Sequence, residues 1–175
     1  MTQLSQTIFK SVILGLVTLF FVATGCQQPD ASKELKPVTD ALVEAWNTGN
    51  LDPLDAIIDP QYVRHVSPAS KTGAVGLDSL KKVISNVRTT YPDFHITLDE
   101  EIYVGDKAAS RWRYTATNTG PGSIPPTGKK ITATGISILH FKNGNIVDEW
   151  VETDNLVVMQ QLGFTLTPPS GVTEK

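Results

Sequence analysis

The segment from Lys130 to Gly163 constrains the fold of this chain most strongly. Asn143-Gly144 stands there between two runs in which apolar residues alternate with other residues. Such a dipeptide is the strongest short-range signal for a β-hairpin, because a type I′ turn needs a positive φ angle at both central residues. The segment therefore predicts two long antiparallel strands, a tight turn between them and a closing helix.

Strand alternation divides this predicted hairpin into two unlike faces. A regular pairing centred on the turn places Ser137 opposite Trp150. One face then holds small, aromatic and acidic residues, namely Gly135, Ser137, Trp150, Glu152 and Asp154. The other face is mostly branched aliphatic and holds Ile136, Ile138, His140, Val147 and Val151. This asymmetry predicts a sheet that packs on one side and lines a cavity on the other.

The preceding residues predict helices followed by strands. Apolar residues recur at helical spacing within 35–46 and again within 80–87, and Asp52-Pro53 suits the start of a short helix between them. A short strand is expected at 62–66, and two long strands at 95–104 and 107–119. Helices that precede a long meander predict an α+β domain, with N-terminal helices packed on a strongly curved, mostly antiparallel sheet.

The first 25 residues predict a lipoprotein signal peptide. Lys10 precedes an apolar run that is short for a membrane span, and Ala23-Thr24-Gly25-Cys26 follows that run. The small residues before Cys26 resemble the bacterial processing box, in which the cysteine is lipidated and becomes the new first residue. An ordinary secretory leader or membrane anchor with a chance cysteine is the alternative. Cys26 is the only cysteine, so no internal disulfide is possible.

These features predict four segments and an envelope location. The segments are a signal peptide at 1–25, the lipidated cysteine and a tether at 26–34, one domain at 35–164 and a flexible tail at 165–175. Removing the signal peptide removes only Lys10 from 15 basic residues, which leaves 14 against 18 acidic residues. An acidic chain without a basic cluster argues against nucleic acid as a partner. Gln27 and Gln28, rather than Asp, follow Cys26. The resemblance to bacterial lipoproteins therefore implies the outer membrane, facing the periplasm.

Seven short motifs, in order along 35–164, carry a family resemblance. They are AWNTGN at 45–50, YVRH at 62–65, YPDF at 91–94, TNTG at 117–120, IPPTGK at 124–129, FKNGNIVDEW at 141–150 and QQLG at 160–163. The series resembles the SnoaL-like polyketide cyclases, or ester cyclases, of the nuclear transport factor 2-like superfamily. The resemblance implies a cone-shaped fold and cofactor-free aldol chemistry, in which a carboxylate moves protons and polar groups hold an enolate. The family's Gln, His and Asp positions hold Gly135, Ser137 and Val151 here.

The candidate site residues follow from alternation and from this resemblance. Asp154 is the candidate general base, and a cap on the final helix is the alternative. His65 is a candidate proton shuttle, and a hydrogen bond to a backbone carbonyl is the alternative. The residues predicted to bind ligand are Tyr62, Trp112, Tyr114, Asn118, Ser137 and Trp150. The sequence shows no spaced set of metal ligands and no phosphate-binding loop, so no metal or cofactor is expected.

Two classes of function remain open at this stage. The first is a cofactor-independent enzyme that cyclises or isomerises a small hydrophobic or aromatic carbonyl compound. The second is a non-catalytic, lipid-anchored binding module, which Gly135, Ser137 and Val151 favour. In both, a homodimer through the open face of the sheet is expected, because the predicted helices are too few to cover both faces and the resemblance agrees.

Overall fold

The computed structural model of the chain describes residues 30–67 and 73–167. The predicted signal peptide, Cys26 and most of the predicted tail lie outside these residues. The elements, in order, are α2 (Ser32–Thr48), α3 (Leu54–Ile57), β1 (Ile58–Val66), β2 (Ala74–Val75), α4 (Leu77–Thr90), β3 (His95–Val104), β4 (Lys107–Thr117), β5 (Lys130–Lys142), β6 (Asn145–Thr153) and α5 (Asn155–Leu162). Helices precede the long strands, and a short helix closes the domain.

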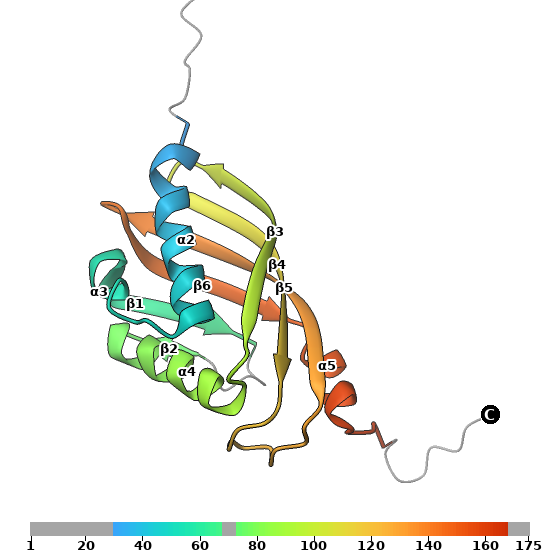
Figure 1. Ribbon diagram of the computed structural model, residues 1–175. Coiled ribbons are helices and arrows are strands. Elements are labelled where there is room, and N and C mark those ends of the chain that lie inside the picture. The colour runs from blue at the N-terminus through green and yellow to red at the C-terminus, as the bar shows by residue number, and fades with distance from the viewer. Residues whose placement is uncertain (1–29, 68–72, 168–175) are drawn as a thin grey trace, which may run out of the picture.

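The six strands form one curved sheet in the order β2-β1-β6-β5-β4-β3. All neighbours are antiparallel except β1 and β6, which are parallel. Helices α2 and α4 lie across one face of the sheet, which we call the inner face (Figure 1). The opposite, outer face carries no helix within the described residues. The predicted α+β architecture, with helices on a curved and mostly antiparallel sheet, is confirmed.

Helix α2 packs on the sheet through one apolar stripe. Its buried side chains recur every three or four residues and are Leu35, Thr39, Leu42, Ala45 and Trp46. Gly49, with a φ angle of 78°, ends the helix in the left-handed conformation that glycine adopts most readily. The Asn47 side chain donates to the carbonyl of Ile96 at 3.0 Å and accepts from its amide at 2.7 Å. These two bonds tie the end of α2 to the start of β3.

The β5–β6 hairpin turns where the sequence predicts. Asn143 and Gly144 have φ angles of 53° and 83°, so both take the left-handed conformation that the turn requires. Phe141 pairs with Ile146 beside the turn, as a regular pairing centred on the turn requires.

One extra residue in β6 then reverses the predicted faces of this strand. His140 pairs with Asp148, so Val147 has no partner on β5 and forms a β-bulge. Because side chains alternate, the bulge moves every later β6 residue to the face opposite the predicted one. The predicted pairing of Ser137 with Trp150 is therefore wrong, and Ser137 pairs with Val151.

No helix in the described part of the chain is long and apolar enough to cross a membrane.

Candidate functional site

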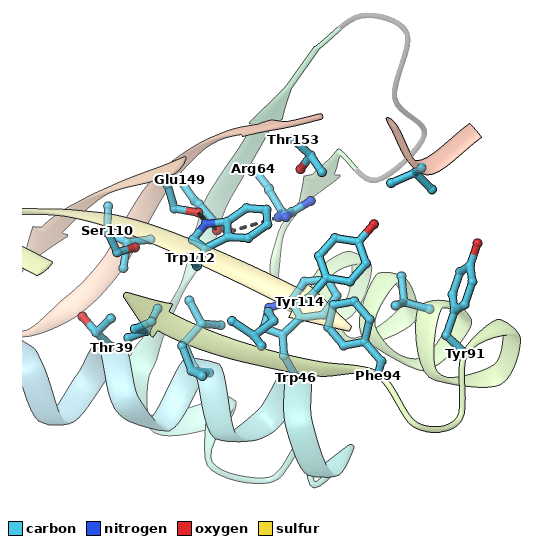
Figure 2. Close-up of a pocket in the computed structure, with 18 of the residues that line it drawn as sticks. Thr39, Trp46, Arg64, Tyr91, Phe94, Ser110, Trp112, Tyr114, Glu149 and Thr153 are labelled. Atoms are coloured by element: carbon cyan, nitrogen blue, oxygen red, sulfur yellow. Dashed lines mark hydrogen bonds and ion pairs between the residues drawn. The ribbon is translucent and has the colours of Figure 1, made fainter. Parts of the chain in front are cut away.

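A cavity of about 270 Å³ lies between α2 and the inner face of the sheet. Its walls come from α2, from β1, from β3 to β6, from the end of α4 and from the start of α5 (Figure 2). This volume is just below the range of about 300–1,000 Å³ that is usual for ligand pockets. The lining is largely apolar, with a few polar side chains that converge near its middle.

Glu149 on β6 supplies a buried carboxylate to this cavity. The residue is 4% exposed, and it faces inward because it follows the bulge at Val147. Its Oε2 accepts a hydrogen bond from the Tyr62 hydroxyl at 2.5 Å and lies 3.0 Å from Arg64 Nε. Its Oε1 accepts a hydrogen bond from the Ser137 hydroxyl at 3.3 Å. Burying a charge is costly without such partners, and this carboxylate has three.

The parallel pairing of β1 with β6 brings these partners together. Arg64 pairs with Glu149, and Tyr62 lies two residues earlier on the same face of β1. The guanidinium of Arg64 also lies over the Trp46 ring, 5.3 Å from its centroid. Burial raises the pKa of the Tyr62 phenol, and the charge of Glu149 raises it further. Tyr62 therefore stays protonated and remains a hydrogen-bond donor to Glu149.

A second hydrogen bond fixes the direction of the Ser137 hydroxyl. Trp112 Nε1 donates to Ser137 Oγ at 3.0 Å. An indole N–H can only donate, so Ser137 accepts this bond and turns its own proton to Glu149. Trp112 thus donates to Ser137 and Ser137 donates to Glu149, which forms one chain of hydrogen bonds that ends on the carboxylate.

Gly135 makes room for the Trp112 ring. A Cβ atom at this position would lie 2.2 Å from Trp112 Cη2 and 2.4 Å from the Glu152 carbonyl oxygen. Only glycine leaves the indole free to lie against β5 at this point of the sheet. Gly135 therefore allows the Trp112 ring to form this part of the cavity wall.

Aromatic rings close the other end of the cavity. The Phe94 ring lies 5.9 Å from the ring of Trp46 and 4.9 Å from that of Tyr114, centroid to centroid. Tyr91 stands beyond them at the end of α4 (Figure 2). Burial raises the pKa of Tyr114 and also that of Tyr91. The arrangement offers flat apolar walls next to a polar centre, which suits a small ring compound.

Asp154, the predicted general base, lies outside this cavity. Its side chain is exposed at the N-terminus of α5, and its Oδ1 accepts a hydrogen bond from the amide of Val157 at 3.1 Å. The alternative interpretation, a helix cap, is therefore the one that the structure supports. The prediction that Asp154 faces the cavity is wrong, because the bulge at Val147 reverses the end of β6.

His65 and Trp150 also lie outside the cavity, on the outer face. The His65 ring stacks on Trp150 at 4.4 Å and 15°, and His65 Nε2 lies 2.9 Å from Asp148 Oδ1. His140 packs against the same indole at 4.6 Å. The parallel register pairs His65 with Trp150, as it pairs Arg64 with Glu149. The predicted position of Trp150 in the cavity is wrong for the same reason as that of Asp154. The predicted position of His65, which followed from the resemblance, is wrong because β1 turns Arg64 and not His65 to the inner face.

The other predicted residues divide into two groups. Trp112, Tyr114 and Ser137 lie in the cavity lining, where their role in binding stays a prediction. Tyr62 is fully buried behind Glu149 and acts on the cavity only through that residue. Asn118 is fully buried away from the lining, and its Oδ1 accepts from the amide and hydroxyl of Thr127 at 2.8 and 2.9 Å. It holds the loop between β4 and β5 closed.

Sequence reasoning missed the acidic and basic residues of the site. Glu149 and Arg64 stand next to Trp150 and His65 in the chain, within the VDEW and YVRH motifs. A pairing with one unpaired residue in β6 would have placed Glu149 on the inner face. No residue type in 145–149 marks such a bulge. The described residues contain no cluster of three or more His, Cys, Asp or Glu side chains that could hold a metal ion.

Comparison with known proteins agrees with this architecture. The chain matches the family described as SnoaL-like polyketide cyclase over residues 36–162. It belongs to this family. No curated protein matches the sequence.

Several solved structures superpose well on the chain. TsrD from Streptomyces laurentii is 27% identical, with a TM-score of 0.67 over 75% of this chain and 96% of its own. A proposed polyketide cyclase from Bacillus cereus is 29% identical, with a TM-score of 0.63 over 74% and 80%. IdmH from Streptomyces antibioticus, also a proposed polyketide cyclase, is 25% identical, with a TM-score of 0.65 over 75% and 99%. The fold is thus shared with two proteins that are described as proposed polyketide cyclases.

Proposed function

We propose that this protein binds a small hydrophobic or aromatic carbonyl compound in the inner cavity and that Glu149 exchanges a proton with it. The observation that carries the proposal is the buried carboxylate beside Arg64 and an aromatic wall. The reaction class is aldol-type cyclisation or isomerisation, which both begin with the removal of a proton next to a carbonyl group. No cofactor is required for this step.

The charges in the site suit such a step. Glu149 takes the proton from the carbon, and the electron pair of the broken C–H bond moves onto the carbonyl oxygen. The Arg64 guanidinium, beside the carboxylate, stabilises the negative charge that develops on this oxygen. As Glu149 becomes neutral, Arg64 loses one negative partner and gains another in the enolate. Tyr62 and Ser137 hold the carboxylate in place throughout.

Exchange of carbon-bound protons tests this proposal. The two-ring ketone 2-tetralone carries activated protons beside its carbonyl, and their replacement by deuterium in heavy water can be followed by proton NMR. Wild-type protein should accelerate the exchange, and Glu149→Gln should lower the acceleration by about 100-fold or more, as expected for the loss of a general base. Glu152→Gln, which changes an exposed carboxylate on the same strand, should leave the rate unchanged.

A non-catalytic binding module is the second candidate. It is favoured because Glu149 already accepts hydrogen bonds from three protein donors, which satisfies a purely structural ion pair as well. In this case 2-tetralone binds, but wild-type protein and Glu149→Gln show the same slow exchange. Measuring affinity and exchange on the same samples therefore separates the two functions.

We also propose that the protein is exported and anchored by a lipid on Cys26, facing the periplasm from the outer membrane. The support is the apolar run that ends in Ala23-Thr24-Gly25-Cys26. Membrane-fraction protein should then carry a diacylglyceryl mass on an N-terminal peptide that begins at Cys26, and Cys26→Ser should abolish it. An unmodified peptide that begins elsewhere would contradict the anchor.

A homodimer through the outer face is the last part of the proposal. Strand pairing places exposed apolar side chains in one row across β3, β5 and β6, where Ile102, Ile138 and Trp150 are 56%, 42% and 40% exposed. An uncovered row of this kind is typical of an interaction surface. Light scattering at tens of micromolar should give twice the monomer mass, and Ile138→Glu should halve it. A monomeric wild-type protein would contradict the dimer.

A further inference from the structure

The Arg88 side chain, in the last turn of α4, joins this helix to two other segments behind the aromatic end of the cavity. Its Nη1 donates to the carbonyl oxygens of Trp46, Asn47 and Phe94 at 3.1, 2.6 and 3.2 Å. Its Nη2 donates to the carbonyl oxygen of Pro92 at 3.0 Å. One guanidinium group therefore holds the end of α2 against the segment that leads from α4 into β3.

These bonds satisfy the end of α2, which lacks a cation of its own. Carbonyl groups in the last turn of a helix have no partner inside the helix, and the negative end of the helix dipole attracts a cation. The last turn of α2 contains no basic residue, so Arg88 supplies the positive charge from another helix. Gly49 makes room for it, because a Cβ atom there would lie 2.9 Å from Arg88 Nε and 3.0 Å from its Cδ.

Two of the residues whose carbonyl groups Arg88 binds form part of the aromatic wall. Trp46 and Phe94 line the cavity, and Figure 2 shows their rings at the same end of it. The rings lie 5.9 Å apart, centroid to centroid. Trp46 belongs to α2 and Phe94 precedes β3, so their relative position depends on contacts between these segments. The bonds from Arg88 are such contacts, and they reach the backbone of both residues directly.

Arg88 lies apart from the polar centre of the cavity. It does not line the cavity itself, and the centre is held by the ion pair of Arg64 with Glu149, at 3.0 Å. A substitution at Arg88 should therefore change how the cavity holds a ring and leave the proton transfer at Glu149 in place.

We infer that Arg88 is a positioning residue, which fixes Trp46 and Phe94 relative to each other and thereby sets the affinity for the substrate ring that lies farthest from the carbonyl group. This inference rests on the proposed function of the cavity, and it adds a residue outside the lining that determines how well a two-ring substrate binds. A smaller substrate that reaches only the polar centre does not depend on Arg88.

Deuterium exchange into two ketones tests this inference, with KM and kcat measured separately. 2-Tetralone carries a second ring that can reach the aromatic wall, and cyclohexanone lacks this ring. Arg88→Lys keeps the charge but loses the planar group that binds several carbonyl oxygens at once. It should raise KM for 2-tetralone by about 10-fold, change kcat by less than about 2-fold and leave KM for cyclohexanone unchanged.

Gly49→Ala tests the same contact without removing the guanidinium group. Its methyl group would push Arg88 away from α2, which should raise KM for 2-tetralone in the same direction, by about 3-fold. Gly105→Ala is the matched control, because Gly105 also has a positive φ angle, of 57°, and a Cβ atom there would meet nothing within 4 Å. This control should leave KM for both ketones unchanged.

The outcomes separate this inference from the proposed function. An unchanged KM for 2-tetralone in Arg88→Lys would overturn the inference, and so would an equal rise in KM for cyclohexanone. A fall in kcat at constant KM, which partial unfolding would produce, would show that Arg88 only stabilises the fold. If wild-type protein binds 2-tetralone without exchange, the dissociation constants should show the changes expected for KM. Failure of wild-type protein to bind either ketone would instead contradict the proposed small-molecule site, on which this inference rests.

Discussion

Glu149 and Trp150 are neighbours in the chain, yet they serve opposite sides of the sheet. Glu149 lies on the inner face, 4% exposed, with hydrogen bonds from Tyr62, Arg64 and Ser137. Trp150 lies on the outer face, 40% exposed, between the rings of His65 and His140. The polar residue is the buried one, and the large aromatic residue is the exposed one.

This contrast shows that strand register, and not hydrophobicity, decides which face of the sheet each of the two residues occupies. The bulge at Val147 places a carboxylate inside, and such a site persists only where partners compensate for the burial of charge. The outer face makes no such demand, because water reaches its polar groups. The inner cluster should therefore be sensitive to single substitutions, whereas the outer cluster should tolerate them.

The largest effect is expected from Glu149→Ala. The substitution removes the carboxylate from the Arg64 guanidinium, whose side chain is only 9% exposed. Breaking a buried ion pair in this way costs about 3–5 kcal/mol of unfolding free energy. Urea denaturation at a single protein concentration measures the cost. Glu152→Ala, at an exposed position on the same strand, should change it by less than about 0.5 kcal/mol. Equal losses for both variants would contradict the contrast between the faces.

Gly135→Ala should have the next largest effect. Its new methyl group would meet the Trp112 ring and the backbone of Glu152, and only the ring can move away. Overpacking of this kind costs about 1–3 kcal/mol, and displacement of the indole should also break its bond to Ser137. Gly73→Ala is the control, because its nearest neighbour would lie at 3.4 Å, an ordinary contact. A fully stable Gly135→Ala variant with unchanged tryptophan fluorescence would show that the cavity wall accommodates the methyl group without moving the Trp112 ring.

The sequence predicts the elements of this fold better than it predicts their faces. The Asn143-Gly144 turn, the apolar stripe from Leu35 to Trp46 and the order of helices and strands all follow from local patterns. The face of each β6 residue depends on Val147, an ordinary strand residue that nothing in the chain marks as a bulge. The partner of β1 is equally hidden, because its parallel pairing with β6 joins segments about 85 residues apart.

The bulge in β6 and the pairing of β1 with β6 also decide which site residues the sequence predicts correctly. Trp112, Tyr114 and Ser137 lie on strands β4 and β5, which pair regularly along their whole length, and alternation places them in the cavity lining. Asp154 and Trp150 lie beyond the bulge in β6, and alternation misplaces them. His65 lies on β1, where the resemblance misplaces it. Arg64 and Glu149, adjacent to two of these, become visible only when the register of both strands is known.

A spectrophotometric titration of the four tyrosines should show how deeply their side chains are buried. Burial raises the pKa of each of them, and it raises that of Tyr103 to about 12, assisted by the bond to Glu101. The folded chain then holds these protons more tightly than the unfolded chain, whose phenols have a pKa of about 10. The resulting stability is present below pH 10 and is lost as the pH rises through the folded values. Ionisation of any tyrosine near pH 10, before unfolding, would place that side chain nearer to solvent than the structure does.

The smallest effect is expected on the outer face, from Trp150→Ala. This indole keeps 40% of its surface in water and packs against the rings of the two histidines, so its loss should cost about 1 kcal/mol of unfolding free energy. Trp46→Ala is the matched change on the inner face, where the indole is 6% exposed and contacts both Phe94 and Arg64, and it should cost about 3–5 kcal/mol. Both variants should be measured by urea denaturation at several protein concentrations, because a dimer through the outer face would make the loss for Trp150→Ala grow with concentration. If Trp150→Ala cost as much as Trp46→Ala at the lowest concentration, the outer cluster would be part of the core of the monomer, and the division into a demanding inner face and a tolerant outer face would fail.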